Sequence, residues 1–211
     1  MSEAEESTQQ SSEGPQAQAE EVLTVSYERL RHSDDAQELS RLARQTLPDR
    51  SDQAAFSRAT ALLEAVAGNE HTPVEDRVFL AETMPFPNIL VKLSQDPEPQ
   101  VRRAVAANKD DKNWLAGLLT KDPDQGVRAA ALANPMTSWK MRLEGAQSED
   151  TDSQTLDFLG QLGVDIESDA PVVLAAMVRR AVALNSSSEA STIERLKSDK
   201  DASVAKAAAS R

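Results

Sequence analysis

The sequence predicts an all-α protein in which helix pairs repeat along the chain and stack into a short right-handed α-solenoid. Three observations support this prediction. Aromatic residues make up only 3% of the chain and glycines number only seven, whereas strands favour aromatic and β-branched residues. One sequence motif recurs at an interval of 26 residues, and fixed periods of this size indicate a solenoid. Within each copy the apolar residues follow the i, i+3, i+4, i+7 spacing of one helix face.

Residues 1–21 form an acidic tail that contains six glutamates and no basic residue. It has no apolar face to bury, so we expect it to be disordered. The first residues lack the basic and apolar regions of a signal peptide. The longest apolar run, Val172 to Val178, is too short to cross a bilayer. We therefore expect a cytoplasmic protein that does not insert into a membrane.

Two further regions follow the tail. Residues 22–57 are expected to form an N-terminal helical cap, and residues 58–211 a helical repeat array. Helical patterns with short polar breaks run over Val25–Leu47, Gln53–Gly68 and Val74–Thr83. The repeat pattern is degenerate around 144–170, where we expect one poorly matching unit near 156–160.

The repeated motif is clearest in four places. The segment 96–108 aligns with 122–134, and the same frame returns over 178–185 and 199–208. Each copy is predicted to be a helix that buries one valine, which we call the frame valine. It lies five residues after the aspartate in the clearest copies, as at Val101 and Val127. Asparagine closes the stripe and is expected to adopt the left-handed conformation that ends a helix. Asp96 and Asp122 are expected to cap the helices that follow them, and the leucines of 89–93, 115–119 and 193–196 to form the second helix of each pair.

The frame Asp-x-x-x-x-Val-Arg-x-x-Val-Ala-x-Asn-Pro resembles the variant leucine-rich repeat, a relative of HEAT and armadillo repeats. The resemblance covers residues 58–211 and implies a helical array that serves as a binding scaffold. Some members of that family also carry a cysteine-ligated iron–sulfur cluster. This chain has no cysteine, so neither that cluster, a disulfide nor a thiolate zinc site is expected.

Basic residues follow the frame valine and are the first candidates for a binding surface. They are Arg102, Arg103, Arg128, Arg179 and Arg180, with Lys206 at the end of the series. On stacked helices about 8–10 Å apart they are expected to form a ladder along one face. One interpretation is a cationic groove for an acidic peptide or phosphate groups. The other is that each arginine pairs with an aspartate of an adjoining repeat, such as Asp96, Asp122 or Asp199, and fixes the repeat geometry.

The two tryptophans of the chain, Trp114 and Trp139, each open the first helix of a repeat. Tryptophan is favoured as an anchor at protein interfaces. It also fills the seam between two repeats equally well. Both interpretations stay open at the level of the sequence.

No pattern in the sequence indicates catalysis, a metal or a cofactor. His32 and His71 are the only histidines and have no metal-ligand spacing. The acidic stretch 149–169 lacks the spacing of a calcium loop. Residues 160–163 lack the spacing of a phosphate-binding loop, and no nucleophile elbow occurs. We therefore do not expect an enzyme.

The sequence thus predicts a non-enzymatic scaffold that binds another protein or an acidic peptide segment; its oligomeric state is left open. The alternative is a nucleic-acid-binding HEAT-like protein or a DNA-repair glycosylase-like enzyme, with which Trp114, Trp139 and the arginines are loosely compatible. The net charge of −12 argues against a nucleic-acid binder.

Overall fold

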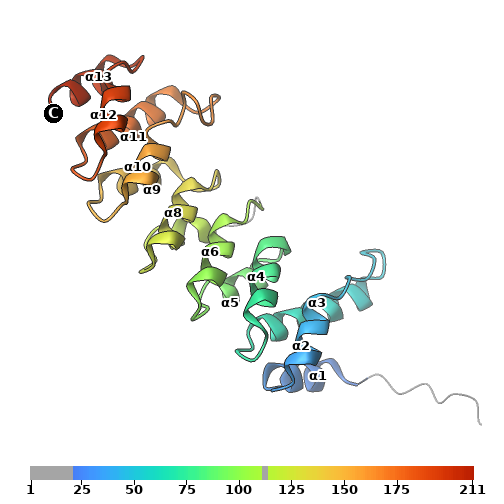
Figure 1. The fold of residues 1–211 in the computed structure, drawn as a ribbon. Helices are drawn as coiled ribbons and strands as arrows, with labels where there is room; N and C mark the ends of the chain where they lie inside the picture. Colours follow the sequence, from blue (N-terminus) through green and yellow to red (C-terminus); the bar gives the residue numbers. More distant parts are fainter. Residues whose placement is uncertain (1–20, 111–113) are drawn as a thin grey trace, which may run out of the picture.

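A computed structural model describes residues 21–110 and 114–211. Within these residues the chain forms thirteen helices and no extended strand, which confirms the all-α prediction. Figure 1 shows an elongated array with α1 and α13 at opposite ends. The predicted acidic tail lies outside the described residues except for Glu21. No described helix is both long and apolar enough to span a membrane.

The helices are short, and most are joined by tight turns. In the first half they are α1 (Leu23–Arg31), α2 (Ala36–Ala43), α3 (Gln53–Ala67), α4 (Val74–Thr83), α5 (Pro87–Leu93), α6 (Pro99–Ala107) and α7 (Leu115–Leu119). In the second half they are α8 (Gln125–Ala133), α9 (Trp139–Gln147), α10 (Ser153–Leu159), α11 (Val172–Leu184), α12 (Ala190–Leu196) and α13 (Ala202–Ala209).

Helices pack chiefly on the helix two places along the chain, which sorts them into two rows. In the even-numbered row α4, α6, α8 and α10 pack in succession, whereas α9, α11 and α13 do so in the odd-numbered row. The buried apolar residues form two clusters, one ending at Ala131 and the next beginning at Leu132. The core is therefore a chain of small contacts that runs the length of the array.

The frame valines lie where the sequence predicts. Val101 on α6, Val127 on α8, Val178 on α11 and Val204 on α13 are each 0% exposed. The alanines three and four places later are small, so adjacent helices of a row can approach closely. The frame changes rows between α8 and α11, because the interval from Val127 to Val178 contains two further helices, α9 and α10. Frame helices therefore belong to the even row in the middle of the array and to the odd row at its C-terminal end.

The frame asparagines end their helices in a way that differs from the expectation. Asn134 has an extended backbone, with φ −70° and ψ 127°, and not a left-handed one. Its buried Nδ2 donates to the carbonyl oxygens of Ala106 (2.7 Å) and Asn108 (2.8 Å) on the preceding frame helix. Its Oδ1 accepts the N–H of Met136 at 2.9 Å. The side chain thus satisfies carbonyls that a helix end leaves without intrahelical partners.

The same bonds recur at other asparagines of the array. Asn69, Asn108 and Asn185 each donate to backbone carbonyls at the end of the neighbouring helix in their row. The left-handed prediction was wrong because it considered only the asparagine's own helix. Asparagine is needed at this position because its side chain forms a tertiary contact, which joins the ends of two neighbouring helices.

Three local expectations also need correction. The N-caps of α6 and α8 are Glu98 and Asp124, while Asp122 lies two residues earlier and accepts the N–H of Asp124. The pattern expected as continuous from Val25 to Leu47 is divided into α1 and α2, because Asp35 caps a new helix through the N–H groups of residues 37 and 38. The leucines of 115–119 form the short helix α7 as expected, but Leu118 among them is 57% exposed.

Candidate interaction surface

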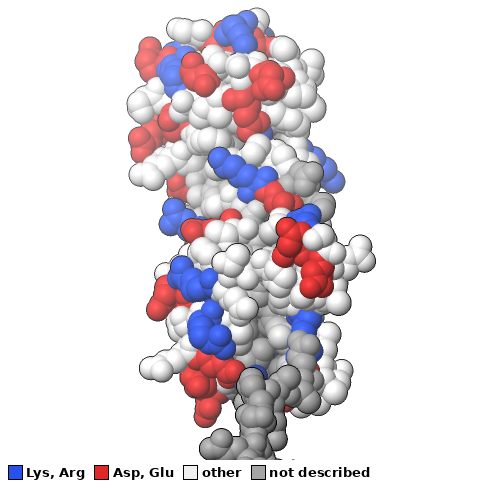
Figure 2. All heavy atoms as spheres, turned by 90° about the vertical axis from the view of Figure 1, so that its right-hand side faces the viewer, with Lys and Arg blue, Asp and Glu red and all other residues white. Residues whose placement is uncertain are grey.

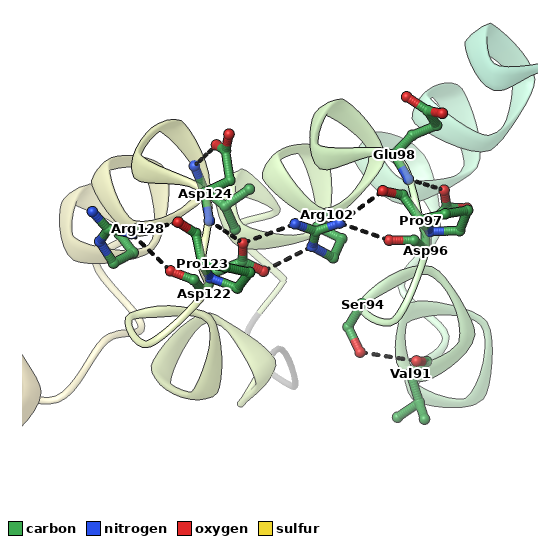
Figure 3. A network of polar contacts seen from close by, with 11 residues as sticks. Val91, Ser94, Asp96, Pro97, Glu98, Arg102, Asp122, Pro123, Asp124 and Arg128 are labelled. Carbon is green, nitrogen blue, oxygen red and sulfur yellow. Dashed lines mark hydrogen bonds and ion pairs between the residues drawn. The ribbon is translucent and has the colours of Figure 1, made fainter.

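Arg102 is held within the chain by a bidentate ion pair (Figure 3). Its Nε lies 2.8 Å from Asp122 Oδ2 and its Nη2 lies 2.9 Å from Asp122 Oδ1. Its Nη1 also donates to the backbone carbonyl of Asp96. Arg128 repeats the second contact one unit later, with Nη1 donating to the carbonyl oxygens of Asp122 and Pro123. Its Nη2 donates to the carbonyl oxygen of Asp150 at 3.2 Å, before α10. Arg102 through Asp122 and Arg128 through Asp150 therefore connect neighbouring repeats.

Arg179 forms the same pair at greater depth. Its Nε lies 2.7 Å from Asp199 Oδ2, and the side chains of Arg179 and Asp199 are 1% and 3% exposed. Arg77 and Asp96 form a related buried pair, which sequence analysis missed. A usable signal was present, since each arginine precedes its aspartate by 19 or 20 residues. The guanidinium groups of Arg77, Arg102 and Arg179 are therefore bound within the fold and do not form a free cationic surface.

The charge on Asp122 is stabilised by its surroundings. Burial raises the pKa of this carboxyl, but the hydrogen bonds from Arg102 and from the N–H of Asp124 outweigh that effect. As a result the pKa of Asp122 is lowered from its ordinary value of 3.8. The pair is therefore ionised at neutral pH and contributes to the stacking of repeats.

Arg103 and Arg180 are the two candidate arginines whose side chains are exposed. They line different grooves: Arg103 lies over α6, α8 and α10, and Arg180 lies over α9, α11 and α13. The change of row between α8 and α11 separates them. The expected ladder is consequently divided between the two rows. On the face seen in Figure 2, acidic and basic side chains are interspersed along the length of the molecule.

The tryptophans occupy different environments. Trp139 is half-buried against the second apolar cluster, and the guanidinium of Arg142 lies 4.9 Å from its ring centroid. Arg142 itself is bound by both carboxylate oxygens of Glu167 at 2.7 Å. Trp114 is 60% exposed at the start of α7. Trp139 therefore occupies a seam, whereas Trp114 is available to solvent.

Helix α11 exposes an apolar stripe that sequence analysis did not single out. Val173, Met177 and Leu184 are 71%, 47% and 52% exposed, and Arg180 lies on the same face. These four residues, spaced by four, three and four positions, lie on one side of the helix. We call them the α11 stripe. The opposite side of α11, which includes Val178 and Val182, is fully buried.

Open grooves flank the α11 stripe on both sides. The groove between α11 and α13 measures about 500 Å³ and includes Lys206, Ala207 and Ser210 on its far wall. The groove between α9 and α11 measures about 240 Å³ and includes Leu143 and Gln147. Both grooves share Met177, Arg180 and Leu184 as lining residues. The stripe is therefore a ridge that a partner could straddle.

Comparison with the other frame helices indicates that the repeat itself does not require the apolar stripe. The positions of Met177, Arg180 and Leu184 lie one before, two after and six after the frame valine. The same positions are Gln100, Arg103 and Ala107 on α6, Gly126, Ala129 and Ala133 on α8, and Ser203, Lys206 and Ser210 on α13. The other frame helices therefore form with small or polar residues at these positions. α11 is also longer, at 13 residues against 8 or 9 in the other frame helices, and its extra N-terminal turn displays Val172 and Val173.

The groove between α11 and α13 carries three charged side chains. Arg180 and Lys206 have no ion pair within the residues that the structure describes. Asp201 is the third and acts as the N-cap of α13. The hydroxyl of Ser203 and the N–H groups of Val204 and Ser203 donate hydrogen bonds that lower the pKa of Asp201. Its carboxylate therefore stays ionised, and the two cations outweigh it by one positive charge in the groove.

The two histidines, although 39 residues apart, line a single open pocket of about 310 Å³ at the ends of α1 and α3. Arg31 and Glu70 also line this pocket. No group of three or more potential metal ligands occurs within the described residues. The fold therefore brings His32 and His71 to the same pocket, which their spacing in the sequence did not reveal.

Comparisons with family models, with curated proteins and with solved structures found no match.

Proposed function

We propose that this protein is a non-enzymatic interaction scaffold: a right-handed α-solenoid of helix pairs, similar to variant leucine-rich and HEAT repeats, that holds another protein on its surface. The recurring frame, the packing of helices on helices two places along and the asparagine bonds between helix ends support this assignment. Repeat arrays of this kind bury their faces only by stacking, which leaves an extended surface for binding.

The observation that carries the proposal is the α11 stripe. A repeat frame that places serine or glutamine at equivalent positions has no structural need for Met177 and Leu184 to be apolar. Contiguous apolar surface that solvent reaches is costly and marks protein interaction sites. The grooves beside the stripe supply the concave walls that an interface requires.

The test uses the double variant Met177→Ser, Leu184→Ser, which copies residues that α13 carries at the same frame positions. Both side chains are about half exposed, so the melting temperature should stay within about 2 °C. Affinity purification from native cells, followed by quantitative mass spectrometry, should recover a partner with the wild-type chain. The double variant should lose it.

The matched control is Leu118→Ser, which removes a side chain of similar exposure from α7. It should retain the partner at the wild-type yield. Recovery of the same proteins with the wild type and the double variant would contradict the proposal. Capture of duplex DNA with a steep loss at higher salt would instead favour a nucleic-acid binder.

A further inference from the structure

We infer that the α11 stripe and its flanking grooves bind an acidic amphipathic helix of about three turns. The inference rests on the proposed function and specifies the chemistry of the partner. It is drawn from the spacing of the stripe, from its length and from the charges beside it.

The spacing of the stripe favours a helix as the partner. Residues at intervals of four and three positions form the kind of seam on which a second helix packs with its own side chains between them. The stripe lies between grooves formed with α9 and α13. A helix that lies on such a surface presents residues at i, i+3, i+4 and i+7 as its anchors.

The length of the stripe sets the size of the partner. From Val173 to Leu184 the axis advances by about 16 Å at 1.5 Å per residue. A partner helix of about 11 or 12 residues spans that distance, with two or three apolar side chains against Val173, Met177 and Leu184. Beyond Leu184 the surface ends at buried Asn185, which closes α11.

The charges favour acidic residues beside the partner's apolar anchors. Arg180 lies inside the stripe, and Lys206 faces it across the groove from α13. The one carboxylate in this groove, Asp201, is engaged by the N–H groups that it caps. Together with the charge of Asp201, Arg180 and Lys206 leave this groove with one net positive charge, and the groove between α9 and α11 has Arg180 and no acidic lining residue. A carboxylate on the partner would therefore meet a net positive surface, which favours charge-complementary docking.

A second copy of the chain fits this surface poorly. In an antiparallel pair of α11 helices Arg180 would face Met177 of the other copy, and the two Arg180 side chains would lie about one helical turn apart. In a parallel pair they would face each other directly. Both arrangements place like charges together in a partly desolvated contact, which is unfavourable. The chain's own residues 1–21 contain Met1 as their only large apolar side chain, so they cannot fill the stripe.

The experiment selects helical peptides displayed from a library against the full-length protein. Each peptide has 16 residues on a helix-favouring background. Four anchor positions vary among Leu, Ile, Met and Phe, and the flanking positions vary among Glu, Gln and Lys. Wild-type protein should enrich peptides with Glu at the flanks. Their affinity should fall at least about tenfold on the Met177→Ser, Leu184→Ser variant, because two anchoring contacts are lost.

Charge reversal tests the acidic preference separately. The variant Arg180→Glu should bind the enriched peptides about tenfold more weakly and should itself select Lys at the flanks. The variant Arg41→Glu, which reverses an exposed arginine on α2, should leave the selection unchanged. Melting curves of all variants should coincide, since each substituted side chain is exposed.

Several outcomes would overturn the inference. These are the absence of any enriched peptide, enriched peptides that bind the double variant equally well, and selection without a preference for Glu. Self-association that the double variant abolishes would assign the surface to a second copy of the chain. The proposed function has an independent outcome: a partner lost only with the double variant supports a scaffold even when the peptides show no acidic preference.

Discussion

At the scale of single residues, the frame asparagines connect one helix end to the next. Each has its side chain buried, and each replaces missing intrahelical partners of a neighbouring helix rather than of its own. A buried carbonyl without a partner destabilises a fold more than an average hydrogen bond stabilises it. This asymmetry explains why asparagine recurs at the end of helices that otherwise consist of alanine and valine.

Replacing Asn134 by Ala should therefore be costly. The change leaves the carbonyls of Ala106 and Asn108 and the N–H of Met136 without their partner, and should lower the free energy of unfolding by about 3 kcal/mol. Urea denaturation measures it. The control is Gln100→Ala, since Gln100 is exposed on α6 and should tolerate the change within about 0.5 kcal/mol. Equal losses at the two positions would show that the asparagine bonds add nothing specific.

At the scale of helices, the paired arginines and aspartates connect the start of one frame helix to the turn before the next. The Arg102–Asp122 pair joins α6 to the segment that precedes α8, and the Arg179–Asp199 pair does the same for α11 and α13. Because the folded pKa of Asp122 is depressed, its ionised form stabilises the fold at neutral pH. That contribution is present above the unfolded pKa and is lost as the pH falls through the folded pKa.

The variant Asp122→Asn should separate this contribution from other acid effects. At pH 7 it should lower the free energy of unfolding by an amount on the order of 3 kcal/mol, because Arg102 loses its buried counter-charge. Below the ordinary pKa of 3.8 the wild type loses the same stabilisation. The difference between the two proteins should therefore shrink as the pH falls from 5 to 3. A constant difference across this range would mean that the charge of Asp122 is unimportant.

The helices are also where sequence analysis was most and least successful. Periodicity correctly placed Val101 and Val127 in the core, because burial of one helix face is what the spacing encodes. The pairing of Arg102 and Arg179 with aspartates was one of two open interpretations, and only the packing of separate repeats decides it. The exposure of Met177 and Leu184 was not singled out, because apolar residues on most of α11 suggest burial; the signal was the polar Gln100 and Ser203 at the position equivalent to Met177. The change of row after α8 was not predicted, because Val127 and Val178 are 51 residues apart and the sequence between them has no clear copy of the motif.

At the scale of the whole molecule, one segment of the chain is purely acidic, whereas the groove beside the α11 stripe has an excess of positive charge. Residues 1–20 carry five glutamates and no base, while Arg180 and Lys206 face the groove beside the stripe. An acidic segment attached to the same chain is present at a high effective concentration. It should therefore compete weakly with an acidic ligand for the two cations.

Deleting residues 1–20 should tighten binding of an acidic peptide. The gain should be largest at low ionic strength, because exposed charges are screened within about 8 Å at physiological salt. Titrations of the full-length and the shortened chain at two salt concentrations measure it. A full-length chain with these five glutamates changed to glutamine should behave like the shortened one. Identical affinities at low salt would exclude the competition.

The asparagine bonds and the arginine pairs together have a mechanical consequence. Between α6 and α8 the Asn134 bonds lie at the C-terminal ends of the helices, and the Arg102–Asp122 pair lies near their N-terminal ends. A nine-residue helix is about 13 Å long, so this joint is fastened at two well-separated points, as is the joint between α4 and α6 through Asn108 and the Arg77–Asp96 pair. Such a joint resists twisting far more than a joint fastened at one end. The array should therefore behave as a torsionally stiff rod, whose exposed ridges keep their relative orientation whether or not anything is bound.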